Sequence, residues 1–200
     1  LHDQLFASFE KALDASVSPE GYVPTGMYEI IVGPEANPKA VPDIFNNEWE
    51  NGQLAWPTEV LTPDDPRVSG TLDKIHRCDY REGLLGYRNG RGAGYSDLHG
   101  YSGNTLIYQL IARGDQPQAL TDLYFLLLHT DSTHGVWEQG CLSWADRDSV
   151  EWTAPHSWAA ARMALSIRNM LVVEQGGRAG LDEDERGLRL FSVISPAWAQ

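Results

Sequence analysis

The chain has 200 residues, of which 42% are hydrophobic, which suits one globular domain or one part of a larger one. Its formal net charge of −13 argues against nucleic acid as a partner, because Lys and Arg would have to neutralise the phosphates. The same charge argues against binding to an anionic membrane surface. An acidic surface is compatible with a neutral ligand, and neither a signal peptide nor a transmembrane run is visible.

The first third of the chain predicts two helices separated by a long loop. Residues 3–15 carry an apolar face with helical spacing. Residues 22–46 are rich in proline and predict a loop with a short strand near 27–32. The next helix is predicted to begin at Thr62, with proline in its first position and two acids in its first turn. Its predicted buried face consists of Val68, Leu72 and Ile75.

The middle of the chain predicts a helical hairpin that follows a glycine-rich loop over residues 86–103. Apolar stripes run along residues 103–113 and again along residues 116–130. Gly114 ends the first of these helices and Asp115 caps the second. Two striped helices joined by so short a turn form an antiparallel αα-hairpin.

A helix over residues 158–173 is apolar on almost every side, and Gly176-Gly177 is expected to stop it. Such a helix is expected to be enclosed by other structure. Its one narrow polar stripe consists of Arg162, Ser166 and Asn169. We expect residues 1–175 to form the helical domain and residues 176–200 to form a linker and the start of a following segment. That segment contains a strand-like run at 188–193.

The loop before this helix concentrates the side chains that a sugar site needs. It places the carboxylate of Glu138 among His134, Trp137, Trp152 and His156. Loops on a rigid scaffold commonly carry function, and aromatic rings stack on the apolar faces of sugars. The acidic Glu50 and Glu59 lie near Trp49 and Trp56 earlier in the chain, where each could act as an acid or a sugar ligand.

Three strings resemble the last hairpins of the six-hairpin, or (α/α)6-barrel, glycosidase superfamily: WPTEVLTPDDPRV, LLLHTDSTHGVWEQG and PHSWAAARMALSIRNMLV. The resemblance is strongest over roughly residues 45–198. It implies an all-α fold, a toroid of paired helices with a sugar site at one mouth. Only about six helices fit into this chain, whereas the toroid needs twelve, so we expect an incomplete barrel.

A narrower similarity is to glucoamylase-type enzymes, in which the acid of a Glu-Gln pair before the last barrel helix is the catalytic base. The pair Glu138-Gln139 stands before His156-Ser157-Trp158 in the same way. The similarity implies that Glu138 activates the attacking water. The general acid of such enzymes comes from an earlier hairpin, so it could be absent from this chain.

These features predict a glycoside hydrolase that cleaves an oligo- or polysaccharide by a two-carboxylate inverting mechanism. The catalytic candidates are Glu138, Glu50 and Glu59. The candidate substrate-binding residues are Trp49, Trp56, His134, Trp137, Trp152 and His156.

No cofactor is implied, and no Cys/His spacing suggests a metal site. We expect Cys78 and Cys141 to be buried thiols rather than a disulfide. The rest of a larger chain or another subunit could complete the protein. The sequence leaves the compartment open, with a periplasmic or secreted protein favoured over a cytoplasmic one.

Two other functions remain open. A polysaccharide lyase needs a base and a cation that neutralises a uronate carboxylate, and His134, His156, Tyr101 and Arg162 supply these groups. The third possibility is a sugar-binding module without catalysis, or a fragment of a larger glycosidase.

Overall fold

The computed structural model describes residues 1–24, 51, 53–87, 97–138, 141–142, 155–175 and 187–199. The predicted strand near 27–32 lies outside these ranges, as do three of the candidate site residues, Trp49, Glu50 and Trp152.

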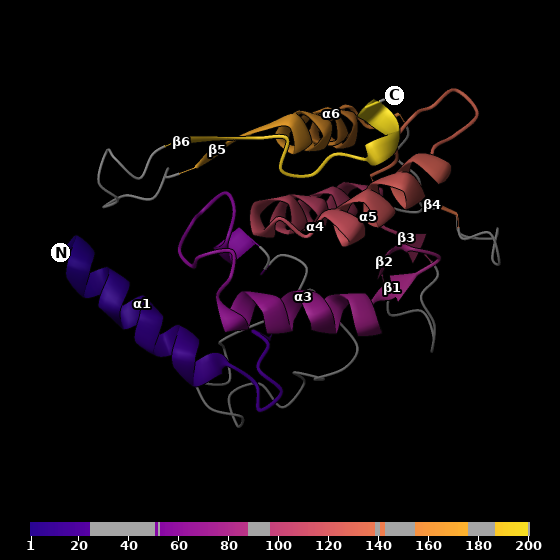
Figure 1. Cartoon of the computed structure of the whole chain (residues 1–200). Helices are drawn as coiled ribbons and strands as arrows, with labels where there is room; N and C mark the ends of the chain where they lie inside the picture. Colours follow the sequence, from indigo (N-terminus) through magenta and orange to yellow (C-terminus); the bar gives the residue numbers. More distant parts are fainter. Residues whose placement is uncertain are drawn as a thin grey trace.

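The described chain is mostly helical, which confirms the all-α class (Figure 1). Its helices are α1 (His2–Ser16), α3 (Pro66–Cys78), α4 (Gly100–Arg113), α5 (Gln116–Leu128) and α6 (Ser157–Leu171), with a 3-10 turn at Pro196–Ala199. The short strands are β1 (Tyr80–Arg81), β2 (Leu84–Tyr87), β3 (Asp97–Leu98), β4 (Cys141–Leu142), β5 (Val172–Gln175) and β6 (Gly187–Leu190). None of the described helices is long and apolar enough to cross a bilayer.

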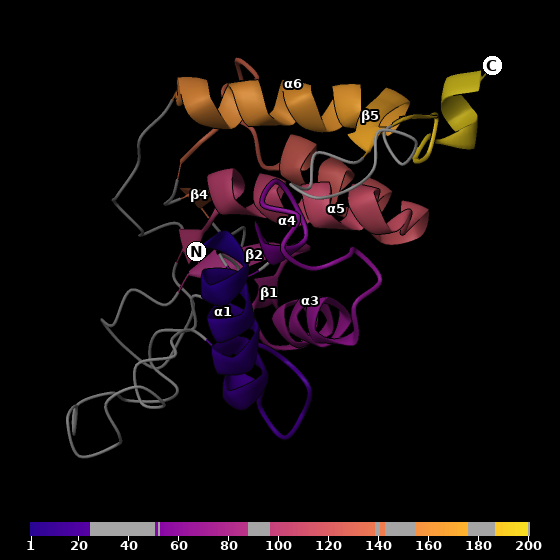
Figure 2. The ribbon, with the colours of Figure 1, turned by 90° about the vertical axis from the view of Figure 1, so that its left-hand side faces the viewer.

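The helices form layers, with α6 over α4 and α5, and α3 beneath them (Figures 1 and 2). Strands β1 to β4 form one antiparallel sheet in chain order, and β5 pairs with β6 in a second. Helix α4 is the centre of the molecule, because its residues from Ser102 to Ile111 are all buried. The main apolar side chains that it contributes to the core are Leu106, Ile107, Leu110 and Ile111.

The predicted hairpin of α4 and α5 is confirmed. Gly114 ends α4 in the left-handed conformation, at φ 76°, which glycine adopts without a steric penalty. The next residue, Asp115, caps α5 by accepting a hydrogen bond from the backbone N–H of Gln118 at 3.4 Å. These two local signals place α5 antiparallel against α4.

Two helix starts differ from the prediction. Helix α3 begins at Pro66 and not after Thr62, because Asp65 provides the same cap-then-proline pattern three residues later and accepts from the N–H of Arg67 at 2.8 Å. Helix α4 begins at Gly100 within the predicted loop, because the ring of His99 acts as its cap.

Helix α6 contradicts the prediction of an enclosed helix. It ends at Leu171, directly before β5, and its outer side is open, with Ile167 37% exposed and Leu171 39% exposed. Its polar stripe faces inward, because Ser166 is buried and its hydroxyl group lies 3.3 Å from the Asn104 amide oxygen of α4. The apolar residues on the other side therefore have no described cover.

This two-sided environment predicts unequal effects of truncation along α6. Met170 is fully buried, so Met170→Ala should lower the free energy of unfolding by about 2–5 kcal/mol. Ile167→Ala removes a partly exposed side chain and should cost less than about 1 kcal/mol. Urea denaturation of both variants checks the assignment. Equal losses would mean that the outer side of α6 is covered.

The chain after α6 returns to the helical core. Strand β6 supplies the predicted strand over part of 188–193, and it pairs with β5 from Val172↔Leu190 to Gln175↔Gly187. Beyond it, Val193 is fully buried in the core, and its N–H donates to the carbonyl of Met170 at 3.4 Å. The division into domains at residue 175 stays a prediction.

The prediction of a buried thiol is wrong for Cys78, which is exposed in the last turn of α3. The buried face of α3 is set by Thr71, Leu72 and Ile75, and the helical turn carries Cys78 away from it. The side chain of Cys141 lies outside the described part of the structure.

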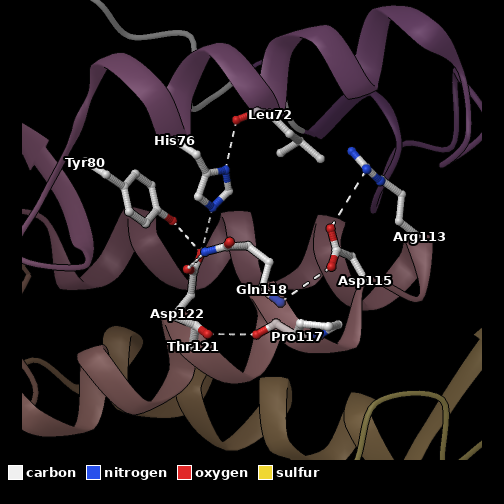
Figure 3. A network of polar contacts seen from close by, with 9 residues as sticks. All are labelled: Leu72, His76, Tyr80, Arg113, Asp115, Pro117, Gln118, Thr121 and Asp122. Atoms are coloured by element: carbon white, nitrogen blue, oxygen red, sulfur yellow. Dashed lines mark hydrogen bonds and ion pairs between the residues drawn. The ribbon is translucent and has the colours of Figure 1, made fainter.

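A buried polar cluster joins α3 to α5 (Figure 3). The carboxylate of Asp122 accepts from His76 Nε2 at 2.9 Å, from the Tyr80 hydroxyl at 2.6 Å and from the Gln118 amide at 2.6 Å. The other ring nitrogen of His76 lies 2.8 Å from the carbonyl oxygen of Leu72, so both ring nitrogens face acceptors. Burial lowers the pKa of His76, but the hydrogen bond and the charge of Asp122 outweigh it and raise that pKa above its ordinary value. His76 and Asp122 therefore form a buried ion pair.

Candidate functional site

The first turns of α4 and α6 lie side by side, and each helix is capped by a histidine. His99 Nδ1 accepts from the N–H of Ser102 at 3.3 Å, and His156 Nδ1 accepts from the N–H of Ala159 at 3.1 Å. The ring of Tyr101 lies 6.0 Å, centroid to centroid, from each of the two imidazoles. Burial lowers the pKa of His99 to about 4, which keeps its Nδ1 unprotonated as an acceptor at neutral pH.

Glu138 lies at this end of the two helices. Its carbonyl accepts from the N–H of Tyr101 at 3.2 Å, and the N–H of His156 donates to the carbonyl of Val136 at 2.9 Å. The loop is thereby tied to both helix starts. The Glu138 carboxylate is 37% exposed and lies 3.7 Å from His156 Nε2. The structure thus brings together two of the predicted site residues, Glu138 and His156.

The cap decides which nitrogen of His156 carries the proton. Because Nδ1 accepts the hydrogen bond from Ala159, the ring proton belongs on Nε2, the nitrogen that faces Glu138. The Nε2–H group thus lies on the side of the ring that faces the half-exposed Glu138 carboxylate. An accessible carboxylate is the kind of group that a general base requires.

Rings and a guanidinium continue the surface from His156 along α6. Tyr101 and Trp158 meet edge to face at 4.8 Å. The guanidinium carbon of Arg162 lies 4.4 Å from the centroid of Tyr101 and 5.1 Å from that of Trp158, within the range of cation–π contacts. A hydrogen bond from Arg162 to the Thr105 hydroxyl fixes the guanidinium against α4.

A pocket of about 300 Å³ opens beside this cluster, between α4, α6 and the turn at residues 53–57. Trp56 lines it and meets Tyr108 edge to face at 4.7 Å. The carbonyl of Trp56 accepts from the Gln109 amide at 2.6 Å, which holds this turn on α4. The lining consists of Gln53, Trp56, Pro57, Thr105, Tyr108, Trp158, Ala161, Arg162 and Leu165.

Among the described candidates, Trp56 lines this pocket, whereas Glu138, His156 and Glu59 do not. Glu59 follows the turn at residues 53–57 and has a φ of 51°. His134 is exposed, at φ 61°, in a tight loop where its N–H donates to the Asp131 carbonyl at 2.9 Å. Trp137 is partly buried and packs against the core. The roles of His134 and Trp137 in substrate binding stay predictions.

The apolar pattern over residues 158–173 predicts that Trp158 lies in the core. Tyr101 is predicted only as part of a lyase site, and Arg162 only as part of that site and of the polar stripe. One sequence signal could have found the cluster. Each histidine cap is followed two residues later by a large ring, Tyr101 after His99 and Trp158 after His156. Residues at the same position in the first turns of two neighbouring helices meet when those helices start side by side.

The architecture has a solved counterpart. The fold is similar to that of a glycosidase. A solved structure described as "Glycosidase Wild Type" matches with a TM-score of 0.60 and 16% sequence identity, covering 84% of this chain and 43% of its own. This chain therefore spans less than half the length of that glycosidase. No protein-family model matches the sequence, and no curated protein matches it.

Metal-ligand groups are not clustered in the part of the chain that the structure describes: no three His, Cys, Asp or Glu side chains there could hold one ion. The chemistry that the described site offers is that of a carboxylate, an imidazole, a guanidinium and aromatic rings.

The two roles of His156 can be separated by substitution. His156→Ala removes the cap of α6 and should lower the free energy of unfolding by about 1 kcal/mol. His156→Asn keeps a cap but removes the N–H that faces Glu138. We expect asparagine to restore stability in thermal unfolding without restoring turnover. Recovery of both properties would limit His156 to a structural role.

Proposed function

We propose that this chain contributes the carbohydrate-binding and water-activating part of a glycoside hydrolase. The observation that carries the proposal is the position of Glu138. Its accessible carboxylate lies 3.7 Å from His156 Nε2 at the starts of α4 and α6. Glu138 does not line the ring-lined pocket itself; Tyr101 contacts both His156 and Trp158, and Trp158 is part of the pocket wall.

In this proposal a sugar ring lies against Trp56 and Trp158, whose apolar faces suit the C–H face of a sugar. Glu138 accepts a proton from a water molecule, and that water attacks the anomeric carbon. The bond from this carbon to the leaving oxygen breaks as a second carboxylic acid protonates that oxygen. His156 would act as a positioning residue, because its Nε2 lies 3.7 Å from the Glu138 carboxylate.

The second acid is a further part of the proposal. An inverting mechanism separates the two carboxyl groups by about 6.5–9.5 Å, to leave room for the water. None of the described residues that line the pocket is an acid. We propose Glu50, Glu59 or a residue from outside these 200 as the general acid. The last choice agrees with an incomplete barrel, since the chain spans 43% of the similar glycosidase.

A lyase is the second candidate, and the observation that favours it is the meeting of Tyr101, His156 and Arg162 at one end of two helices. A tyrosine or histidine would take the proton beside the carboxylate of a uronate, and Arg162 would neutralise that carboxylate. His134, the fourth group named for this reaction, is exposed in its own loop.

The partner proposals concern the open side of α6. Its exposed apolar residues away from the pocket are Ile167 and Leu171. We propose that the rest of a longer chain or another subunit covers them, because an apolar helix face is rarely left in water. Light scattering on the 200-residue chain measures whether copies associate. The proposed ligand is a carbohydrate, and neither nucleic acid nor a membrane is proposed.

The test is product analysis on a panel of oligosaccharides. Hydrolysis releases new reducing ends, whereas elimination produces unsaturated sugars that absorb ultraviolet light. We expect reducing ends without that absorbance, and proton NMR of the first product gives its anomeric form. Absorbing products would favour the lyase. Binding by calorimetry without any product would reduce this chain to a binding module.

A further inference from the structure

Arg162 is held in the pocket wall by contacts that do not neutralise its positive charge. Its guanidinium packs on the rings of Tyr101 and Trp158 and donates to the Thr105 hydroxyl. The carbonyl of Arg162 accepts from the Tyr108 hydroxyl at 2.7 Å, which fixes this turn of α6 on α4. None of these partners is an anion.

Other arginines of this acidic chain do pair with carboxylates. Arg67 pairs with Asp65 and Asp14, and Arg168 pairs with Glu174. By contrast, no acid within the described ranges lies within 4 Å of the Arg162 guanidinium, and none lines the pocket. With 28 acids against 15 bases in the sequence, a cation that faces a pocket without a described counter-ion suggests that the ligand supplies one.

We propose that this pocket binds the carboxylate of an acidic sugar, a uronic acid, through Arg162. The inference rests on the proposed carbohydrate function of the same site and names its substrate class. A planar guanidinium matches a carboxylate with two parallel N–H···O hydrogen bonds, and its packing on two rings limits the freedom that binding would remove.

The rest of the pocket suits the same ligand. Trp56 and Trp158 offer faces for the sugar ring, while the polar lining residues Gln53, Thr105 and Tyr108 can bond its hydroxyl groups. A volume of about 300 Å³ is at the small end of ligand pockets, which suits a single ring.

The net charge of −13 does not prevent the binding of such an anion. Charges in water are screened beyond about 8 Å at physiological salt, so the local cation decides the potential inside the pocket. We therefore expect the acidic surface to slow association of an anionic sugar at low salt, without changing which sugar the pocket prefers.

The experiment is calorimetric titration of the 200-residue chain with two probes that differ only at C6, methyl glucuronoside and methyl glucoside. We expect the wild-type chain to bind the glucuronoside about 10- to 100-fold more tightly, as a charge-assisted pair of hydrogen bonds implies. Arg162→Gln should remove this preference, so that the two probes bind with similar affinity.

Two further variants make the result specific. Arg168→Gln is the matched control, because Arg168 lies on the same helix, is exposed and pairs with Glu174 outside the pocket. It should keep the full preference. Arg162→Lys retains the charge but not the planar, two-pronged guanidinium, so it should keep part of the preference. This variant replaces Arg162→Gln in the test if circular dichroism shows that Arg162→Gln does not fold.

Equal affinity for both probes, or a preference that survives in Arg162→Gln, would overturn the inference. These outcomes are separable from failure of the proposed function. Hydrolysis of neutral oligosaccharides that depends on Glu138, with no preference for the glucuronoside, would refute the substrate class alone. Arg162-dependent binding of the glucuronoside, with hydrolysis that is undiminished in Glu138→Gln, would refute the role of Glu138 and leave the substrate class.

Discussion

Glu138→Gln is expected to reduce hydrolysis by about 10²- to 10⁴-fold, the range that a general base contributes. The amide has the shape of the carboxylate but cannot accept a proton from water. The amide oxygen can face His156 Nε2 as the carboxylate oxygen does at 3.7 Å. Sugar affinity should therefore remain within a few-fold of the wild-type value, and kcat should carry the loss.

The matched control for this prediction is Glu174→Gln. Glu174 is an exposed acid of β5 that pairs with Arg168, and this pair lowers the pKa of its carboxyl group to about 2. It does not line the pocket. Turnover of this variant should match the wild type. A Glu138→Gln variant that is as active as the control would exclude Glu138 as the base.

Asp122→Asn should produce the largest loss of stability, about 3–5 kcal/mol in the free energy of unfolding. The substitution removes the negative charge that pairs with His76 and leaves a buried imidazolium without its partner (Figure 3). Urea denaturation at pH 6, where His76 is protonated, measures the loss. The control is Asp73→Asn, an exposed acid on the same helix as His76, which should cost less than about 0.5 kcal/mol. Similar losses in the two variants would contradict the buried ion pair.

The same cluster predicts how stability depends on pH. Asp122 raises the pKa of His76 in the folded state above the unfolded value of about 6.5. The contribution of the pair is therefore fully present below about pH 6.5 and is lost as pH rises through the folded pKa. The folded pKa of Tyr80 is also raised, chiefly by burial, so stability should fall again at strongly alkaline pH. A His76→Gln variant should lack the first of these two declines.

The parts of the fold that local chemistry decides were predictable. Gly114 and Asp115 mark the turn between α4 and α5 because a left-handed glycine and an aspartate cap act within a few residues of themselves. The start of α3 was misplaced because Thr62-Pro63 and Asp65-Pro66 carry the same signal, and only tertiary contacts select between them. A histidine cap at residue 99 is not a usual start signal, so the start of α4 was also placed late.

The environment of α6 could not be predicted, since an apolar pattern all round a helix does not say which other chain segments cover it. The helix buries Ser166 and Asn169 against α4 and leaves Ile167 partly exposed, which reverses the expected roles of its polar and apolar residues.

The site was predictable where its residues share one loop. Glu138 and His156 were found together, because the loop that holds them precedes α6 directly. The pattern predicts Trp158 only as a helix residue and Arg162 only as part of a polar stripe and of a lyase site, because their meeting with Tyr101 depends on the packing of α6 on α4. Trp137, a loop tryptophan predicted to bind substrate, packs against the core, and its binding role stays a prediction. Loop position alone does not separate a binding ring from a packing ring.

We propose that a carbohydrate binds where α4 and α6 begin, at the end of the two helices where Glu138 lies. The most direct measurement is a crystal structure of the Glu138→Gln variant with an oligosaccharide. We expect a sugar ring against Trp56 or Trp158, with its anomeric carbon one water molecule away from the side chain of residue 138. A sugar bound elsewhere, or an empty pocket at saturating oligosaccharide, would contradict the account.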